Sequence, residues 1–201
     1  HARMKQWRTC QAPFPRLVYD RLFYVDKNNY YALYPWVKRL REIPGILWLN
    51  RGLPGKWPVY NALKAYPQIR PYLPETSLFS PDGDWPELLF RKGALFLKPS
   101  LGSQGKGVLK ISLAKGKKEI IVIGRDPRFP QEGDRLISRS FASVEPCRRW
   151  LRTFVGSKSY VIQPYLSLRT KDGLPFDLRI LVQKDGHGLW RQTGRAIRLG
   201  P

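Results

Sequence analysis

The stretch LKPSLGSQGKG, residues 97–107, stands between two segments that are typical of β-strands. Residues 94–97 form a short apolar run, and residues 108–112 alternate apolar and polar side chains, as a half-buried strand does. Glycines let the backbone approach an anion closely, so that successive N–H groups can bind phosphate oxygens. Lys98 and Lys106 would add positive charge on either side. The sequence therefore predicts a hairpin whose glycine-rich loop binds phosphate, with a plain turn flanked by lysines as the alternative.

This loop matches neither of two common glycine-rich phosphate motifs. A Walker A loop needs Ser or Thr after its Gly-Lys pair, and here Gly107 follows Gly105 and Lys106. A dinucleotide fingerprint has the spacing GxGxxG before a helix, whereas this spacing is GxxGxG before a predicted strand. Because no helix N-terminus would supply a dipole, the loop would hold phosphate as a flexible lid on a hairpin.

A second predicted strand carries a carboxylate and a guanidinium on one face. Along residues 176–183 the side chains alternate, so Asp177 and Arg179 lie opposite an apolar face formed by Phe176, Leu178, Ile180 and Val182. The planar donors of arginine match phosphate oxygens, and the carboxylate could orient the arginine or help to hold a cation. The alternative is a cross-strand ion pair on an exposed sheet face, which would contribute little to stability.

Residues 161–166, VIQPYL, predict a strand that runs into a loop at Pro164. Backbone N–H and C=O groups in such a hinge can bind the edge of an adenine ring, and Gln163 could assist them. The alternative is a core strand with a polar end.

The other segments predict helices mixed with antiparallel hairpins. A helix is expected over residues 56–66, ending before Pro67, and a second helix is expected between Ser143, as its N-cap, and Gly156. Shorter elements are a helical turn or more at residues 36–40, strands at 46–49 and 120–123, and a turn at 184–188 that pairs 176–183 with 189–199. Regular βαβ alternation is missing, so the predicted fold class is α+β.

The composition points to an anionic partner. The 201 residues include 36 Lys and Arg against 15 Asp and Glu, a formal charge of +21, which attracts phosphate as nucleotide, nucleic acid or anionic polymer. Cys10, Cys147, His1 and His187 are too scattered for a zinc site or a Ser-His-Asp mechanism, so any metal would be a hard cation such as magnesium. No apolar run approaches the ~20 residues of a membrane span, and the start of the sequence lacks the apolar stretch of a signal peptide. Two cysteines make no disulfide framework, which fits the reducing cytoplasm.

Taken together, a lysine on a strand, a glycine-rich lid, a hinge strand and a D-x-R strand resemble the ATP-grasp superfamily. Within it, the chain resembles the YheC/YheD-like endospore coat-associated family. The resemblance covers most of the chain beyond residue 15. It rests on VYDR (18–21), GKWPVYNAL (55–63), RPYLPET (70–76), FLKPSLGSQGKGV (96–108), VIQPYL (161–166), PFDLRILVQK (175–184) and TGRAIRLG (193–200).

The resemblance implies a role in ATP binding for each matching residue. Lys56 is similar to the first ATP-grasp lysine, and Lys98 to the second, which contacts the α and β phosphates. Arg179 resembles the γ-phosphate arginine, with Asp177 beside it at the catalytic centre. The resemblance gives the phosphate lid to Gly102, Ser103, Gly105, Lys106 and Gly107, and the adenine hinge to Gln163, Tyr165 and Leu166.

The resemblance also implies that the ATP-grasp fold is incomplete. Such proteins carry their magnesium ligands, a carboxylate and then an Asn, downstream of the TGRAIRLG-like stretch, whereas this chain stops at Pro201. The chain also does not begin with Met. We therefore expect a fragment: an N-terminal α/β region at residues 1–85 and a truncated ATP-grasp region at 86–201, with no metal ligands of its own. Nucleotide affinity would be weakened and turnover absent in this piece.

Three functions are compatible with these features. The leading one is a carboxylate–amine ligase, which phosphorylates a carboxylate with ATP and magnesium before an amine displaces the phosphate. The second is a non-catalytic spore-coat scaffold that retains the nucleotide site and binds coat proteins or an anionic surface polymer. The third is a nucleic-acid binder, since tryptophans such as Trp36 could stack on single strands. It is less favoured because no helix-turn-helix, RRM or zinc-finger spacing is present. The protein would act in the cytoplasm or be assembled into the spore coat.

Overall fold

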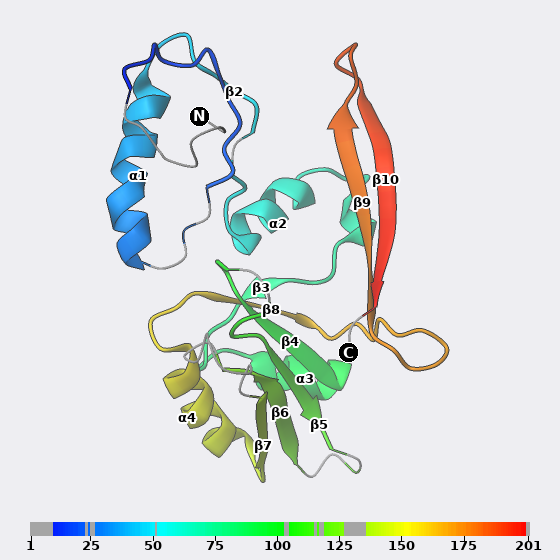
Figure 1. Cartoon of the computed structure of the whole chain (residues 1–201). Helices are drawn as coiled ribbons and strands as arrows, with labels where there is room; N and C mark the ends of the chain where they lie inside the picture. Colours follow the sequence, from blue (N-terminus) through cyan, green and yellow to red (C-terminus); the bar gives the residue numbers. More distant parts are fainter. Residues whose placement is uncertain are drawn as a thin grey trace. The chain divides into compact units, whose positions relative to one another are not determined.

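A computed structural model of the chain describes residues 10–22, 24, 27–50, 52–102, 105–114, 116, 119–126 and 136–199 (Figure 1). Contacts between residues divide the chain into two units, His1–Pro54 and Gly55–Pro201.

The first unit contains two short parallel strands joined by a helix. β1 (Leu17–Val18) pairs with β2 (Leu47–Trp48), and α1 (Lys27–Glu42) connects them. The sequence predicted a helical turn or more at residues 36–40, whereas α1 begins nine residues earlier and continues through Pro35. A proline inside a helix removes one backbone hydrogen bond, so the sequence pattern predicts a helix shorter than the continuous α1.

The larger sheet of the second unit has six strands in the order β3-β8-β4-β5-β6-β7, in which every neighbouring pair is antiparallel. The predicted strand–loop–strand hairpin is confirmed as β4 and β5, which place Phe96 opposite Lys110. The edge strand β3 places Ser77 opposite Ile162 of β8, and this pairing joins residues 55–85 to the sheet rather than to the first unit. The six strands are β3 (Ser77–Leu78), β4 (Ala94–Pro99), β5 (Leu109–Leu113), β6 (Ile120–Arg125), β7 (Leu136–Phe141) and β8 (Tyr160–Pro164).

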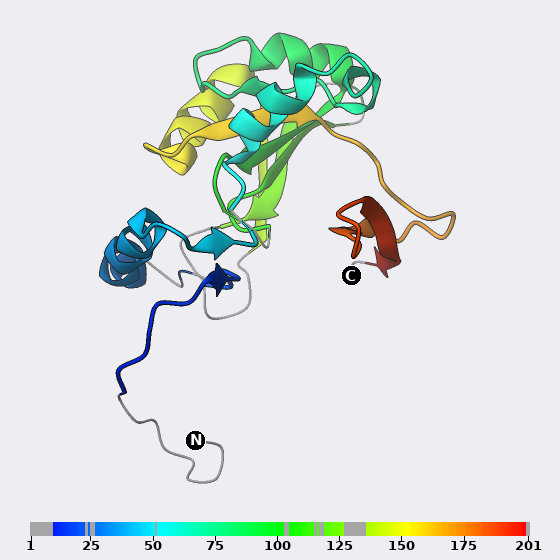
Figure 2. The same ribbon diagram turned by 90° about the horizontal axis from the view of Figure 1, so that it is seen from above.

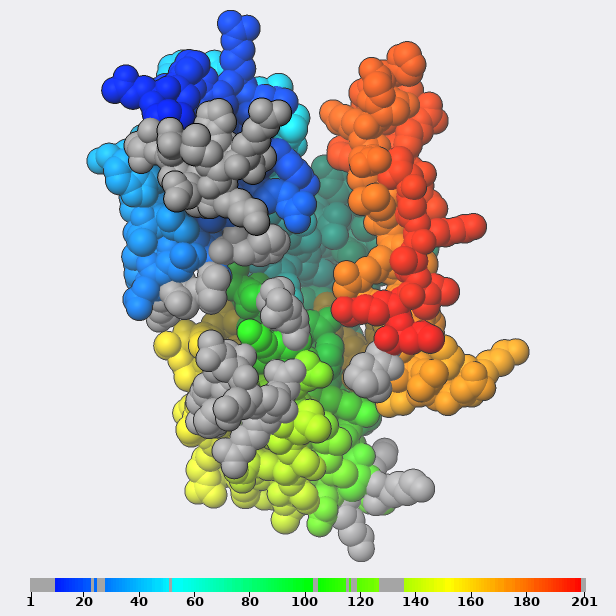
Figure 3. All heavy atoms as spheres, viewed as in Figure 1, coloured from blue at the N-terminus to red at the C-terminus, as the bar shows by residue number. Residues whose placement is uncertain are grey.

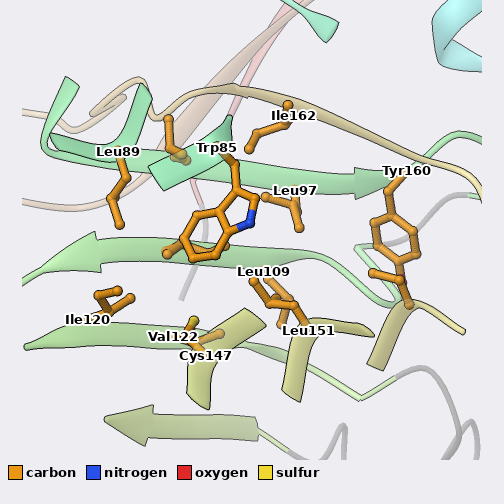
Figure 4. Close-up of a cluster of buried hydrophobic side chains, with 13 residues drawn as sticks. Trp85, Leu89, Leu97, Leu109, Ile120, Val122, Cys147, Leu151, Tyr160 and Ile162 are labelled. Atoms are coloured by element: carbon orange, nitrogen blue, oxygen red, sulfur yellow. The ribbon is translucent and has the colours of Figure 1, made fainter. Parts of the chain in front are cut away.

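Two helices, α3 (Trp85–Lys92) and α4 (Val144–Val155), cover one face of this sheet (Figure 1 and Figure 2). On β4, the alternating residues Leu95 and Leu97 face these helices and are fully buried. Figure 4 shows the core in which the two helices meet the sheet, formed by Trp85, Leu89, Leu97, Leu109, Ile120, Val122, Cys147 and Leu151 among others. Removal of this apolar surface from water is the main driving force for folding of the unit.

The helices that precede and follow the sheet strands agree with the sequence pattern. The helix predicted at residues 56–66 is α2 (Lys56–Lys64), and a 3₁₀ turn, η1 (Arg70–Tyr72), follows it. Helix α4 begins directly after Ser143, as predicted, but the Ser143 side chain makes no capping hydrogen bond. None of the helices in the described ranges combines the length and hydrophobicity that crossing a membrane requires.

The last two strands, β9 (Phe176–Lys184) and β10 (Trp190–Leu199), form a separate two-stranded antiparallel sheet. The predicted turn between them is confirmed, since Asp185 accepts backbone hydrogen bonds from His187 and Leu189. Side chains on both faces of this hairpin are exposed. Figure 3 shows the hairpin from one side. The mixture of helices with antiparallel sheets agrees with the predicted α+β class.

Candidate functional site

Lys98 lies on the face of β4 opposite the core, because it alternates with Leu97. Its Nζ donates to Gln163 Oε1 on the neighbouring strand β8 at 2.8 Å. The Gln163 amide in turn donates from Nε2 to Thr76 Oγ1 at 2.7 Å, and Thr76 donates to the Pro74 C=O at 2.8 Å. A chain of hydrogen bonds therefore links the lysine to the segment that leads into the edge strand β3.

The Lys98 ammonium is half-buried, and its recorded partners among the described residues are neutral. Besides the amide oxygen of Gln163, it lies 4.8 Å from the centroid of the Phe96 ring. Burial, followed by repulsion from the Lys56 ammonium, lowers the pKa of Lys98. The two ammonium groups thus repel each other, and an anion bound beside Lys98 would raise this pKa again.

Lys56, the first residue of α2, is attached to the start of the glycine-rich loop by three hydrogen bonds. Its backbone N–H donates to the Ser100 C=O at 2.8 Å, and its Nζ donates to the carbonyls of Pro99 and Gly102 at 2.8 and 3.0 Å. Burial lowers the pKa of Lys56. Sequence analysis predicted a lysine that reaches phosphate, and the structure shows the same ammonium holding the loop carbonyls.

Close approach between α2 and this loop depends on Gly55. A Cβ atom at this position would lie 2.8 Å from the Ser100 carbonyl oxygen and 2.9 Å from a methyl carbon of Leu101. On the other side of the loop, the Ser100 N–H donates to the Ser159 C=O at 2.8 Å, and the two hydroxyls are 2.8 Å apart. The entry to the loop is therefore fixed from both α2 and the segment before β8.

The predicted lid residues are described in part. Gly102, Gly105 and Gly107 all have positive φ angles, a conformation that side chains disfavour, so glycine is required at these positions. Lys106 is exposed. Ser103 lies outside the described residues. Backbone that turns in this way can direct successive N–H groups toward an anion.

The predicted hinge residues lie beside an aromatic pair. The rings of Phe96 and Tyr165 meet edge to face, with centroids 5.9 Å apart, and the Lys110 ammonium lies 4.2 Å from the Tyr165 centroid. The Tyr165 N–H donates to the Ala94 C=O at 2.9 Å, and the Leu166 side chain is exposed. Sequence analysis missed Lys110, although its position opposite Phe96 follows from the hairpin register.

On the β9–β10 hairpin, Asp177 is bound by two arginines. Arg198, directly opposite, donates from Nε to Oδ1 at 2.9 Å and from Nη2 to Oδ2 at 3.2 Å, and the Arg179 Nε lies 3.4 Å from Oδ2. Arg198, ahead of its other neighbours, lowers the pKa of Asp177. Asp177 and Arg179 therefore share one face, as predicted, and Arg198 is a third member that sequence analysis missed.

The arrangement suits a polyanion. Lys56, Lys98 and the glycine turns supply ammonium groups and backbone donors around one loop, which matches the chemistry of phosphate binding. Within the described ranges no group of three or more His, Cys, Asp or Glu side chains is placed to hold a metal ion.

Comparison with known proteins identifies the family. A family model described as YheC/D like ATP-grasp matches residues 45–201. The chain belongs to this ATP-grasp family. All but the first of the motifs quoted above lie within the matched range, and the resemblance drawn from them is confirmed.

Two relatives of this ATP-grasp chain come from Bacillus subtilis (strain 168). The endospore coat-associated protein YheC is 30% identical over 203 residues, which cover 100% of this chain and 53% of the relative. The endospore coat-associated protein YheD is 24% identical over 193 residues, which cover 96% of this chain and 41% of the relative. The chain thus spans about half the length of the curated relatives it matches. No solved structure gives a significant match.

Proposed function

We propose that the second unit binds ATP, with the α and β phosphates against Lys98 and the glycine-rich loop. The observation that carries this proposal is the Lys98 ammonium, which is half-buried, lies near the Lys56 ammonium and is held by a neutral amide. Charge in such a setting is costly until an anion compensates it. Membership of the ATP-grasp family supports the choice of ATP as that anion.

The remaining roles follow from the same proposal. Lys56 holds the loop and faces the phosphates, and the adenine ring binds along the backbone of the hinge at Gln163, Tyr165 and Leu166. Arg179 binds the γ-phosphate, with Asp177 limiting its movement. The lid consists of Gly102, Ser103, Gly105, Lys106 and Gly107. Magnesium enters this proposal only as the counter-ion of the nucleotide.

For the parent reaction, we propose carboxylate activation of the ATP-grasp ligase type. A substrate carboxylate oxygen attacks the γ-phosphorus, ADP leaves, and a nucleophile such as an amine then displaces phosphate from the acyl phosphate. The alternative is a scaffold that keeps the nucleotide site without turnover. The names of the relatives support a place in the endospore coat, and a charge of +21 suits contact with an anionic surface polymer or acidic coat proteins. ADP release by a longer version of the protein with candidate carboxylates would separate the ligase from the scaffold.

The direct test of ATP binding is a calorimetric titration of MgATP into the wild-type chain and Lys98→Ala. Hydrogen bonds to charged groups contribute about 1.5–3 kcal/mol, so the substitution should weaken binding about ten- to hundredfold. Lys158→Ala removes the same charge from an exposed position outside the site and is the matched control. Equal affinities of wild type and Lys98→Ala would refute the proposal.

A further inference from the structure

A nearly buried hydroxyl stands at the far end of the Lys98 network. Thr76 directly precedes β3 and is 9% exposed. Its Oγ1 donates its single proton to the Pro74 C=O, two residues earlier, at 2.8 Å. Toward any other neighbour, this hydroxyl can therefore act only as an acceptor.

That constraint fixes the orientation of the Gln163 amide. Since Thr76 Oγ1 can only accept, the nitrogen of the amide must face it, as the 2.7 Å contact from Nε2 shows. The amide oxygen then faces Lys98, at 2.8 Å from Nζ. The reversed amide would place two acceptors together at Thr76 and an NH₂ group against an ammonium at Lys98, so only one orientation satisfies every group.

We propose that Thr76 is a positioning residue that acts through Gln163 to hold the Lys98 ammonium in place for phosphate, an inference that rests on the proposed ATP site. Lysine has a flexible four-carbon stem, and ordering it when a ligand arrives opposes binding. A network that orders Lys98 beforehand removes this penalty. It extends from the segment before β3, through β8, to β4.

The same network bears on whether the Gln163 side chain serves the phosphates or the base of the nucleotide. Lys98 and Thr76 hold the two ends of its amide in one orientation, so we assign its side chain to the phosphate end of the ligand rather than to the base. Loss of Thr76 should therefore weaken binding of ATP and GTP by the same factor. If Gln163 instead recognised adenine, disturbing it would change the ratio of the two affinities.

The experiment compares wild type, Thr76→Val and Thr76→Ser in titrations with MgATP and MgGTP. Thr76→Val keeps the shape but removes the acceptor, and it should weaken both nucleotides about three- to tenfold with an unchanged ratio. Thr76→Ser keeps the hydroxyl and should stay within about twofold of wild type. Gln163→Met, which removes the amide but keeps the length of the side chain, tests the same link if Thr76→Val does not fold, and should behave like Thr76→Val.

Lys98→Ala in the same series separates failure of this inference from failure of the ATP site. If Lys98→Ala weakens binding but Thr76→Val does not, or if Thr76→Ser weakens it as much as Thr76→Val, the positioning role is wrong and the ATP site stands. A changed ATP-to-GTP ratio would also overturn it, in favour of base recognition. If neither Lys98→Ala nor Thr76→Val alters affinity, the ATP site itself is refuted.

Discussion

In the second unit, the cationic side chains of the sheet and those of the hairpin differ in their burial and in their charge partners. On the sheet, Lys98 is half-buried and held by neutral groups, and burial lowers its pKa. On the hairpin, the side chains of Arg179 and Arg198 are 60% and 65% exposed and share the carboxylate of Asp177. Among the described residues, Lys98 has no acidic partner and is partly removed from water. The two arginines are neutralised in part by Asp177 and are exposed to solvent.

This difference indicates where binding energy comes from. An anion that reaches Lys98 relieves repulsion and a desolvation penalty, so the interaction should be strong and sensitive to small displacements. An anion that reaches Arg179 competes with Asp177 and with water, so the interaction should be weaker and more easily screened by salt. The proposed site would therefore be anchored at the sheet and completed at the hairpin.

The largest expected contrast is in the packing of the two regions. Leu97→Ala removes a fully buried side chain from β4, next to Lys98, and should lower the free energy of unfolding by about 2–5 kcal/mol. Ile197→Ala on β10, where the side chain is 67% exposed, should change it by less than about 0.5 kcal/mol. Urea denaturation of both variants measures the two values. Similar losses would mean that the hairpin is as firmly packed as the sheet.

The next contrast concerns backbone contact at the loop. Gly55→Ala would force the Ser100 carbonyl and the start of α2 apart, and overpacking of this kind costs about 1–3 kcal/mol. Affinity for MgATP should fall as well, because Lys56 and the loop move together. Gly186→Ala in the hairpin turn meets no atom within 4 Å and should leave stability and affinity unchanged. Calorimetry on the two variants measures both the stability and the affinity for MgATP. If Gly55→Ala changes neither, α2 does not contribute to the site.

Much of this contrast could be predicted from the sequence. The apolar run of residues 94–97 and the alternation in 108–112 predict the hairpin, and the alternation in 176–183 places Asp177 on the same face as Arg179. These patterns involve residues close together in the chain, so they can be recognised from the sequence alone.

The features that the sequence did not predict depend on long-range contacts. Thr76 and Gln163 are 87 residues apart, and nothing near Thr76 in the sequence marks it as a partner of a lysine on another strand. Arg198 could have been found from the hairpin register, which sets it opposite Asp177, but the bulge between Gln192 and Gly194 shifts that register. Strand β7 was not predicted, because the apolar residues of Leu136–Phe141 do not alternate regularly with polar ones; the strand is defined by its pairing with β6.

A smaller effect should appear in the pH dependence of ATP binding. Phosphate favours the charged form of Lys98, whose pKa is lowered in the free protein, so binding takes up a proton between that pKa and the ordinary value of 10.5. Affinity should therefore fall as the pH rises through the lowered pKa, at a pH below 10.5. The free protein should gain stability over the same interval, because its unfolded state binds the proton more tightly.

Lys98→Arg is the control for this pH profile, since a guanidinium stays charged throughout the range. Its affinity should persist to higher pH than that of the wild type in titrations with MgATP. Identical alkaline profiles for the two proteins would contradict a titrating Lys98 at the phosphates.

The smallest expected effect is at the exposed ion pair of the hairpin. Arg198 lowers the pKa of Asp177, so the pair contributes at neutral pH and is lost only as the pH falls below the ordinary range of an aspartate. Asp177→Asn should leave the thermal midpoint at neutral pH nearly unchanged, because the pair is solvent-exposed. A large drop in a melting experiment at neutral pH would mean that the pair is structurally essential.

The central claim is that the sheet and the hairpin bind different phosphates of one nucleotide. It is tested most directly by titrating MgATP and MgADP into wild type, Lys98→Ala and Arg179→Ala. Lys98→Ala should weaken both nucleotides by a similar factor, because ADP retains the α and β phosphates, whereas Arg179→Ala should weaken ATP more than ADP. If Arg179→Ala affects ATP and ADP equally, or if Lys98→Ala affects neither, the two regions do not share a triphosphate.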